Sequence, residues 1–311
     1  MCNLFKFHRI SCLALIAAAV SLAVSSCDDL IPDTLYETVA VNDVVIKSVY
    51  ITDEDYTCPF NVILPSDYET SGKKYPVLYL LHGMTNDNYS WQKDGDVVAM
   101  TEFAVNTGVI DPFIIVLPSA YMTFYVDDLD WSGIPVLEIY PKLKFESFFT
   151  KELQPYVEKN FPVLTDREHT AIAGLSMGGY GAWYLGMSAP DKFSKAASMS
   201  GALDLPAMVA MGDRPGGPAI WENIFGAQRN IADTESDLVY LYDRCVKNGK
   251  VPSLYQSCGT EDFLYPTNVA MRDCLQAKGA DLFYSEGTGH HDWDFWDDRI
   301  KEMFDWMLGM K

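Results

Sequence analysis

The most constraining feature of the sequence is a G-x-S-x-G pattern at residues 174–178, set between two runs of different character. The preceding residues 168–173 are mostly β-branched or small, which is typical of a buried strand, and residues 179–185 are suited to begin a packed helix. The turn between a strand and a helix must be sharp, and Gly174 and Gly178 lack the Cβ atoms that would collide there. In this context the pattern marks a nucleophilic serine, so the sequence predicts that role for Ser176.

A second candidate element follows a continuous apolar run at residues 75–81, which is typical of a strand buried on both faces of a parallel sheet. This run ends in His82-Gly83-Met84. Acyl transfer passes through a tetrahedral oxyanion, which needs two pre-aimed backbone N–H donors, one after the nucleophile and one after such a strand. The candidates are the N–H groups of Met177 and Met84. We expect His82 to brace the loop rather than to act in catalysis.

The remaining members of a catalytic triad follow the serine in the order acid, then histidine. After one predicted strand the chain turns through Glu261 and Asp262, and after the next it turns through His290 and His291. The carboxyl ends of parallel strands meet at one edge of a sheet, where α/β proteins place their sites. A buried carboxylate there fixes the tautomer of the histidine that takes the serine proton. Taken alone, the residue types leave both the acid and the base open.

Four segments together resemble the putative-esterase family of α/β-hydrolases, which includes family 1 carbohydrate esterases, S-formylglutathione hydrolases, siderophore esterases and mycobacterial mycolyltransferases. The resemblance covers roughly residues 45–310 and rests on residues 80–84, 173–182, 258–265 and 291–296. It implies an α/β-hydrolase fold, with a mostly parallel central sheet flanked by helices on both faces. It also implies a carboxylic ester hydrolase with a Ser-Asp-His triad.

The same resemblance separates the two candidate acids and the two candidate bases. In the relatives the triad acid lies where Asp262 stands, and the base is the histidine two residues before a tryptophan, which is His291 in this sequence. The sequence departs from the family at His290, where relatives often have glycine. It also departs at residues 85–88, which replace a glycine-richer loop.

The N-terminus predicts export. Basic residues precede an apolar stretch at residues 13–24, and Ser25-Ser26-Cys27 follows, as in a secretory signal. Because Cys27 directly follows the small pair, the segment resembles a bacterial lipobox, in which Cys27 becomes the lipidated first residue. A plain signal peptide and a short uncleaved anchor are the alternatives. We expect a lipoprotein signal peptide at 1–26, a tether at 27–38 and an esterase domain at 39–311.

These features favour an enzyme that is lipid-anchored to the cell envelope of a Gram-negative-type bacterium. Residues 28–29 are both aspartate and resemble the acidic export signals of some surface lipoproteins, which extends the expectation to the cell surface. The balance of 23 basic against 43 acidic residues gives a net charge of −20. Such a surface repels nucleic acid and anionic lipid. We therefore expect no nucleic-acid partner, and membrane contact through the N-terminal anchor only.

The rest of the composition fits one catalytic domain. An apolar content of 49% supplies ample material for a core. The cysteine spacing fits no zinc signature, and the sequence has no nucleotide-binding loop, so we expect no metal and no cofactor. The sequence does not indicate an oligomeric state. Apolar patterning predicts early strands at 39–50 and 60–64, a buried strand at 113–117, and helices at 145–160 and 293–307.

Substrate choice is expected to lie in two irregular insertions, residues 119–140 and 203–230, which are rich in aromatic and methionine side chains. Ligand sites are concave and mostly apolar, so the candidates for a substrate wall are Tyr125, Trp131 and Trp221. With the resemblance and the export signal, we expect an esterase acting on acylated plant polysaccharide fragments, feruloyl or acetyl. A siderophore or other small-ester hydrolase, and a non-catalytic carbohydrate-binding lipoprotein, are the alternatives.

Overall fold

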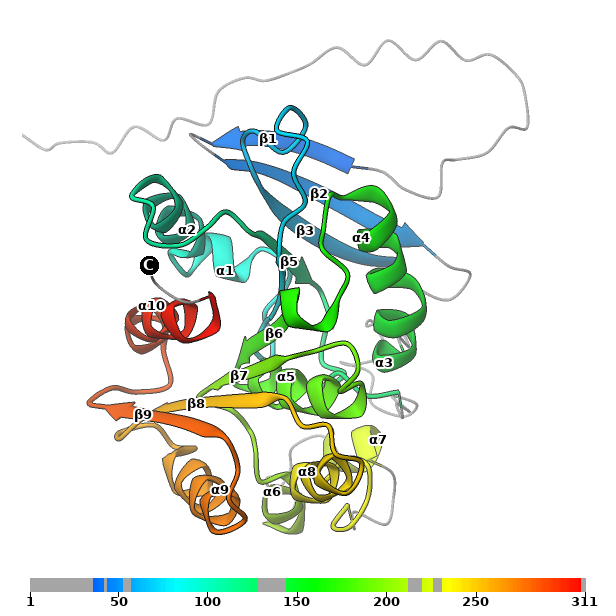
Figure 1. The fold of residues 1–311 in the computed structure, drawn as a ribbon. Coiled ribbons are helices and arrows are strands. Elements are labelled where there is room, and N and C mark those ends of the chain that lie inside the picture. The colour runs from blue at the N-terminus through cyan, green and yellow to red at the C-terminus, as the bar shows by residue number, and fades with distance from the viewer. Residues whose placement is uncertain are drawn as a thin grey trace, which may run out of the picture. The chain divides into compact units, whose positions relative to one another are not determined.

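A nine-stranded sheet runs through the computed structural model, which describes residues 36–41, 44–52, 57–127, 144–211, 220–225 and 231–308 (Figure 1). The strand order is β1-β2-β3-β5-β4-β6-β7-β8-β9. From β1 to β5 neighbouring strands pair antiparallel, and from β5 to β9 they pair parallel. The strands are β1 (Tyr36–Val41), β2 (Val44–Thr52), β3 (Thr57–Pro65), β4 (Val77–Leu81), β5 (Ile114–Pro118), β6 (Thr170–Leu175), β7 (Lys195–Met199), β8 (Ser253–Gly259) and β9 (Leu282–Gly287).

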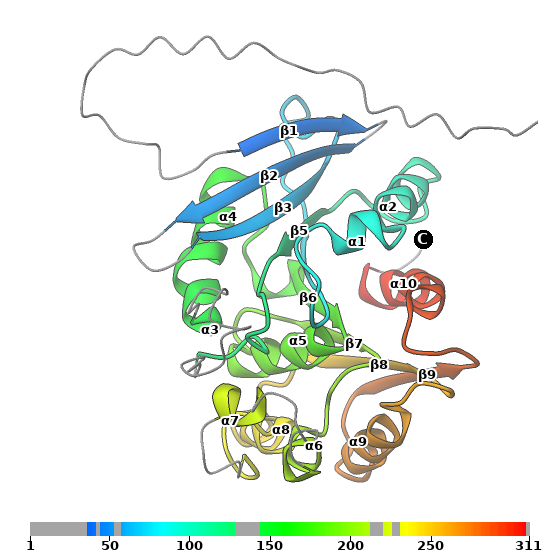
Figure 2. The same cartoon turned by 180° about the vertical axis from the view of Figure 1, so that it is seen from behind.

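Helices cover both faces of this sheet (Figure 1, Figure 2). One buried cluster of side chains includes members from α3 to α9, and the other includes members from α1, α2 and α10. The α-helices are α1 (Ser90–Lys93), α2 (Val97–Asn106), α3 (Phe145–Phe148), α4 (Gln154–Asn160), α5 (Met177–Ser188), α6 (Leu205–Met211), α7 (Ile220–Phe225), α8 (Leu238–Lys247), α9 (Tyr265–Ala277) and α10 (Trp293–Leu308). A π-helical turn occupies Phe149–Leu153, and a 3₁₀ turn occupies Arg167–His169.

The central strands explain why the sequence shows continuous apolar runs. All five residues of β4 are buried, and alternate side chains enter opposite layers. Val77, Tyr79 and Leu81 join the cluster on the α5 side, whereas Leu78 and Leu80 join the cluster on the α10 side. A strand covered on both faces must be apolar at every position. The predicted mostly parallel sheet with helices on both faces is therefore confirmed.

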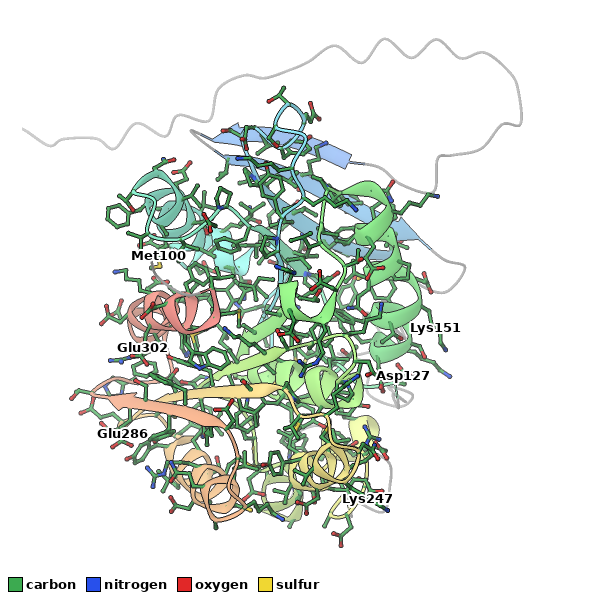
Figure 3. All side chains as sticks on the ribbon, in the orientation of Figure 1. Met100, Asp127, Lys151, Lys247, Glu286 and Glu302 are labelled. Atoms are coloured by element: carbon green, nitrogen blue, oxygen red, sulfur yellow. The ribbon has the colours of Figure 1, made fainter. Side chains whose placement is uncertain are left out.

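Polar contacts fix the last helix, α10, against the sheet. Its Glu302, labelled in Figure 3, accepts a hydrogen bond from Ser285 Oγ on β9 at 3.0 Å. At the C-terminal end of the helix, Lys195 Nζ from β7 donates to the carbonyl oxygens of Trp306 at 3.0 Å and Met307 at 2.7 Å. A cation at a helix C-terminus is favourable because the carbonyl dipoles there point toward it.

Two predicted elements differ in detail from the structure. The single strand predicted at 39–50 is two strands, β1 and β2, which pair antiparallel with Val41 opposite Val44. The sequence between them, Asn42-Asp43, has residue types that hairpin turns favour, so the apolar stretch is divided at that point. The helix predicted at 145–160 is α3 and α4 joined by the π-helical turn, while the helix at 293–307 and the strand at 113–117 are confirmed as α10 and β5.

The predictions for the N-terminus are not addressed by the structure. Residues 1–35, with the signal segment, Cys27 and most of the tether at 27–38, lie outside the described residues. Among the helices in the described ranges, none is long and apolar enough to cross a bilayer. The cysteines in those ranges, Cys58, Cys245, Cys258 and Cys274, are free thiols.

Candidate active site

Ser176 lies in a sharp turn between β6 and α5, with φ 55° and ψ −119°. A Cβ atom on Gly174 would lie 2.3 Å from the carbonyl oxygen of Gly178, and one on Gly178 would lie 2.5 Å from the carbonyl oxygen of Leu81. Both positions therefore require glycine. The Ser176 N–H donates to the carbonyl of Met199 at 2.9 Å, which ties the turn to the end of β7. A serine in this backbone region is strained, and surrounding structure must hold it there.

The structure brings the side chains of Asp262 and His291 to Ser176. His291 Nε2 lies 2.9 Å from Ser176 Oγ, and His291 Nδ1 lies 2.8 Å from Asp262 Oδ2. Asp262 is buried, with 4% of its surface exposed. In contrast, His290 and Glu261 are exposed and contact each other, with His290 Nε2 3.2 Å from Glu261 Oε2. The residues that the sequence alone left open are thus separated by their position in the fold.

The carboxylate of Asp262 is held in its charged form. Burial alone would raise its pKa, but the hydrogen bonds from His291 and from the Leu264 N–H outweigh burial, so the pKa lies below its usual value. A charged carboxylate favours the tautomer in which His291 carries its proton on Nδ1. His291 Nε2 is then free to accept the proton of Ser176. This arrangement generates a nucleophile from a serine hydroxyl.

Aromatic rings enclose the imidazole of His291. The ring of Phe263 lies 4.6 Å from it between centroids, and Trp296 contacts it edge-on at 5.0 Å. Phe263 follows the triad acid directly and is 72% exposed. The sequence analysis did not single out Phe263, although an aromatic residue next to a predicted triad acid could have been recognised as a candidate. These rings restrict the orientation of the imidazole.

The loop after β4 packs against the nucleophile. A Cβ atom on Gly83 would lie 3.4 Å from Ser176 Cβ and 2.7 Å from Leu175 Cδ1, so the loop can approach this closely only with glycine. The carbonyl of Gly83 accepts a hydrogen bond from the Asn86 N–H at 3.2 Å, which closes a turn with Thr85 at φ 67°. The predicted oxyanion donors, the N–H groups of Met84 and Met177, belong to the two loops that meet at Ser176.

Of the three aromatic residues predicted to line the substrate site, the structure describes Tyr125 and Trp221. Tyr125 is fully buried, and its hydroxyl donates to the carbonyl of His82 at 2.7 Å. Its ring fills the space left by Gly181, where a Cβ would lie 2.2 Å from the ring. Tyr125 therefore supports the loop after β4 from inside the protein and is not a substrate wall. Trp221 is partly buried, and the centroid of its ring lies 5.3 Å from that of Phe124. Trp131 lies outside the described residues.

A cavity of about 340 Å³ borders the loop after β4. Asn86, one of its lining residues, has its Oδ1 3.3 Å from the same Gly83 Cβ position that lies 3.4 Å from Ser176 Cβ. The cavity and Ser176 therefore both border the loop after β4. Its lining combines hydroxyl, amide, aromatic and apolar groups with a single carboxylate, and consists of Pro59, Thr85, Asn86, Asp87, Asn88, Ser119, Tyr121 and Met122. The sequence marked this loop only by its departure from the family at residues 85–88.

Within the part of the chain that the structure describes, no group of three or more His, Cys, Asp or Glu side chains is arranged to hold a metal ion.

An α/β sheet with a serine at the strand–helix turn, hydrogen-bonded to a histidine and a buried aspartate, defines a serine hydrolase of the α/β-hydrolase class. The model of the family described as "Putative esterase" matches residues 55–307. The chain belongs to this family and is a carboxylic ester hydrolase, as the resemblance predicted. The α/β-hydrolase fold is confirmed by the solved structures described below.

Individual relatives agree with this assignment. The chain is 30% identical over 250 residues to an acetyl esterase of Caldicellulosiruptor saccharolyticus, covering 77% of this chain and 85% of that protein. It is 33% identical over 150 residues to an endo-1,4-beta-xylanase/feruloyl esterase of Xylanibacter ruminicola, covering 47% of this chain and 20% of that protein.

Among solved structures, a fluorophosphonate-binding serine hydrolase of Staphylococcus aureus aligns with a TM-score of 0.73 at 26% identity, over 86% of this chain and 99% of that one. A ferulic acid esterase aligns with a TM-score of 0.70 at 29% identity, over 85% of this chain and 97% of that one.

Proposed function

We propose that this protein is an exported, lipid-anchored serine esterase that removes feruloyl or acetyl groups from plant polysaccharide fragments. The observation that carries the proposal is the hydrogen-bonded series Ser176–His291–Asp262. A polar cavity lined in part by the loop after β4 supports it. The names of the acetyl and feruloyl esterase relatives support the choice of acyl group. The acidic overall charge suits a neutral substrate.

The proposed reaction proceeds through an acyl-enzyme. Ser176 Oγ attacks the ester carbonyl while its proton passes to His291 Nε2, and Asp262 stabilises the resulting imidazolium. The carbonyl oxygen becomes an oxyanion that accepts hydrogen bonds from the N–H groups of Met84 and Met177. His291 then donates the proton to the departing alcohol oxygen as the carbon–oxygen bond breaks. In the second half, water loses a proton to His291 and attacks the acyl carbon. His291 then returns this proton to Ser176 Oγ as the acyl–serine bond breaks, which releases the carboxylic acid and the free serine.

The lining of the cavity supports a polar, uncharged substrate group. Asn86 and Ser119 present amide and hydroxyl groups, and Tyr121 adds an aromatic ring with a polar tip. Asp87 is the only charged residue in the lining, and a carboxylate would repel an anionic siderophore. A sugar ring or a hydroxycinnamoyl group fits this chemistry better than a strongly charged ligand.

The substrate proposal is tested with matched pairs of esters. Feruloyl and acetyl groups are each presented on an arabinoxylan oligosaccharide and as the simple methyl or aryl ester, and kcat/KM is measured for all of them. We expect the oligosaccharide esters to be hydrolysed at least about tenfold more efficiently, since one good polar contact contributes on that scale. Ser176→Ala is the control for contaminating activity. Equal efficiency on both members of each pair would contradict a carbohydrate substrate while leaving the esterase activity intact.

The proposed location is tested at Cys27. Two or more acyl chains anchor a protein stably, whereas cleavage by an ordinary signal peptidase releases a soluble domain. Mass spectrometry of the membrane fraction should find a diacylglyceryl modification on Cys27, and Cys27→Ala should release the enzyme or leave its precursor unprocessed. An unmodified N-terminus at another residue in the wild-type protein would contradict lipidation.

A further inference from the structure

A buried histidine, His82, lies at the end of β4 directly behind the loop that approaches Ser176. Only 1% of its surface is exposed, and both ring nitrogens have partners. Nδ1 lies 2.7 Å from the carbonyl oxygen of Gly83, and Nε2 lies 2.9 Å from the backbone nitrogen of Ala120. A backbone N–H can only donate, so Nε2 must be the unprotonated acceptor. The ring proton therefore resides on Nδ1 and is donated to Gly83.

This assignment has a direct consequence for the predicted oxyanion donor. The Gly83 carbonyl and the Met84 N–H are the two ends of one peptide unit, which is planar and trans. A hydrogen bond that fixes the direction of the carbonyl also fixes the direction of the N–H, which points the opposite way. The Gly83 oxygen also accepts from the Asn86 N–H at 3.2 Å, so this carbonyl accepts two hydrogen bonds. The peptide unit cannot rotate without losing both of them.

We propose that His82 is a positioning residue that aims and polarises the Met84 N–H for the oxyanion of the reaction. Ala120 donates to the imidazole, the imidazole donates to the Gly83 carbonyl, and the same peptide presents the Met84 N–H. Hydrogen bonds in such a series strengthen one another, because a carbonyl that accepts a hydrogen bond makes the N–H of the same peptide a better donor. Oxyanion stabilisation by pre-aimed donors is a large contribution in enzymes of this kind.

Further contacts hold His82 and the loop after β4 in place. The carbonyl of His82 itself accepts the Tyr125 hydroxyl at 2.7 Å, and the Tyr125 ring is seated in the space beside Gly181 on α5. The loop after β4 is thereby connected to the loop after β5 through Ala120 and to α5 through Tyr125. Burial lowers the pKa of His82 to about 4, so the single neutral tautomer persists over the ordinary working range of pH. His82 does not touch the reacting atoms, so its effect must pass through the peptide of Gly83 and Met84.

Two amide substitutions separate the hydrogen bonds of His82. The side-chain amide of Asn reaches the Nδ1 position, so His82→Asn keeps a donor for the Gly83 carbonyl and loses the acceptor for Ala120. Gln reaches the Nε2 position, so His82→Gln keeps the acceptor and loses the donor. With an aryl acetate as substrate, we expect kcat of His82→Gln to fall by about ten- to a hundredfold with KM unchanged, since loss of a whole oxyanion donor costs about 10²- to 10³-fold. His82→Asn should retain kcat within a few-fold of wild type.

A second readout distinguishes positioning from a general loss of structure. A boronic acid that forms a tetrahedral adduct with the serine should bind His82→Gln more weakly by the same factor as kcat, whereas the carboxylic acid product should bind both variants equally. His169→Gln is the matched control, because His169 is exposed and its Nδ1 contacts Asp166 at 2.7 Å. Equal losses in the Asn and Gln variants, or unchanged affinity for the boronic acid, would overturn the proposal.

A measurement on the wild-type protein does not depend on the folding of either variant. The chain has five histidines, so the ¹⁵N spectrum of histidine-labelled protein is simple to assign by substitution. At neutral pH we expect His82 to be protonated on Nδ1 and unprotonated on Nε2. The opposite tautomer or an imidazolium would overturn the proposal. The proposal rests on ester hydrolysis and on the Met84 donor, and hydrolysis of the aryl acetate by wild type but not by Ser176→Ala shows the esterase activity whatever His82 does.

Discussion

The parallel strands begin at one side of the sheet, its amino edge, and end at the other side, its carboxyl edge. Residues with positive φ differ in type between these two edges. In the described residues, every glycine with positive φ, namely Gly72, Gly108, Gly249 and Gly279, precedes a strand of the parallel part of the sheet, and a Cβ atom there would meet nothing within 4 Å. At the opposite, carboxyl edge, residues with side chains have positive φ. Among them are Thr85, Tyr121, Phe124, Tyr125, Ser176 and Ser200.

The difference indicates what each edge is for. Glycine adopts positive φ at little cost, so the turns at the amino edge only reverse the chain. A non-glycine residue in such a conformation costs about 1–3 kcal/mol and persists only where the surroundings hold it. The carboxyl edge therefore carries strain where Ser176 must be presented and where Thr85 closes the turn against it.

The largest effect is expected at Ser176. Ser176→Ala should reduce kcat by about three decades or more, because triad members contribute on that scale. Ser176→Gly should lose the same activity but raise the free energy of unfolding by about 1 kcal/mol, because glycine accepts φ 55° and ψ −119° without strain. Enzyme kinetics and chemical denaturation measure the two quantities. Persistent turnover in Ser176→Ala, or no gain in stability for Ser176→Gly, would break the comparison.

The neighbouring histidines provide the next test. His291→Ala should also lose about three decades of kcat, since His291 contacts both Ser176 and Asp262. His290→Ala is the matched control and should retain kcat within a few-fold, because its ring lies on the surface beside Glu261. If His290→Ala is the inactive variant and His291→Ala is nearly normal, the assignment of the base is wrong.

Buried His82 should make stability depend on pH. Its pKa is about 4 in the folded protein, mainly because burial disfavours the charged form and despite the nearby Asp87, against 6.5 in the unfolded chain. The unfolded state therefore binds more protons between these values, and stability falls as the pH is lowered through this window. The loss should reach about 3 kcal/mol by pH 4. Denaturation of wild type and His82→Asn across pH 4 to 7 measures it, and identical pH profiles would contradict the buried neutral histidine.

The smallest effects compare one turn from each edge. Thr85→Gly should raise the free energy of unfolding by about 1 kcal/mol because it relieves a β-branched residue at φ 67°, and it should lower kcat because the turn beside Gly83 loosens. Gly279→Ala should lower stability by about 1 kcal/mol at φ 75° with kcat unchanged. Chemical denaturation gives the free energy of unfolding of both variants, and enzyme kinetics gives their kcat. The contrast between the edges fails if both variants shift stability in the same direction.

Much of this architecture could be predicted from local sequence. The runs at 75–81 and 113–117 are strands because the covered faces of β4 and β5 demand apolar residues at every position. The serine turn was predictable because glycine is required within a few residues of it. The choice between Glu261 and Asp262 was not predictable from residue types, because it depends on which carboxylate the fold buries against a histidine from a distant loop.

Other features were hidden because they depend on partners far along the chain. Tyr125 resembled a substrate contact, but its burial depends on the space beside Gly181 on another element. The cavity is lined by the loops after β4 and β5 together with Pro59 on β3, so no single segment indicates it. The sequence analysis expected His82 to support the loop after β4. Which ring nitrogen donates and which accepts could be assigned only from the contact with the Ala120 N–H in the structure.

The order of the triad along the chain has a consequence during synthesis. Ser176 and His291 are separated by 115 residues. The histidine follows β9, which is the outermost strand on the parallel side of the sheet. Chains emerge from the ribosome N-terminus first. A growing or prematurely terminated chain therefore carries the serine without its base, and remains chemically inert toward esters until β9 and α10 have been made and docked. The hydrolase becomes active only after β9 and α10 have folded onto the rest of the sheet.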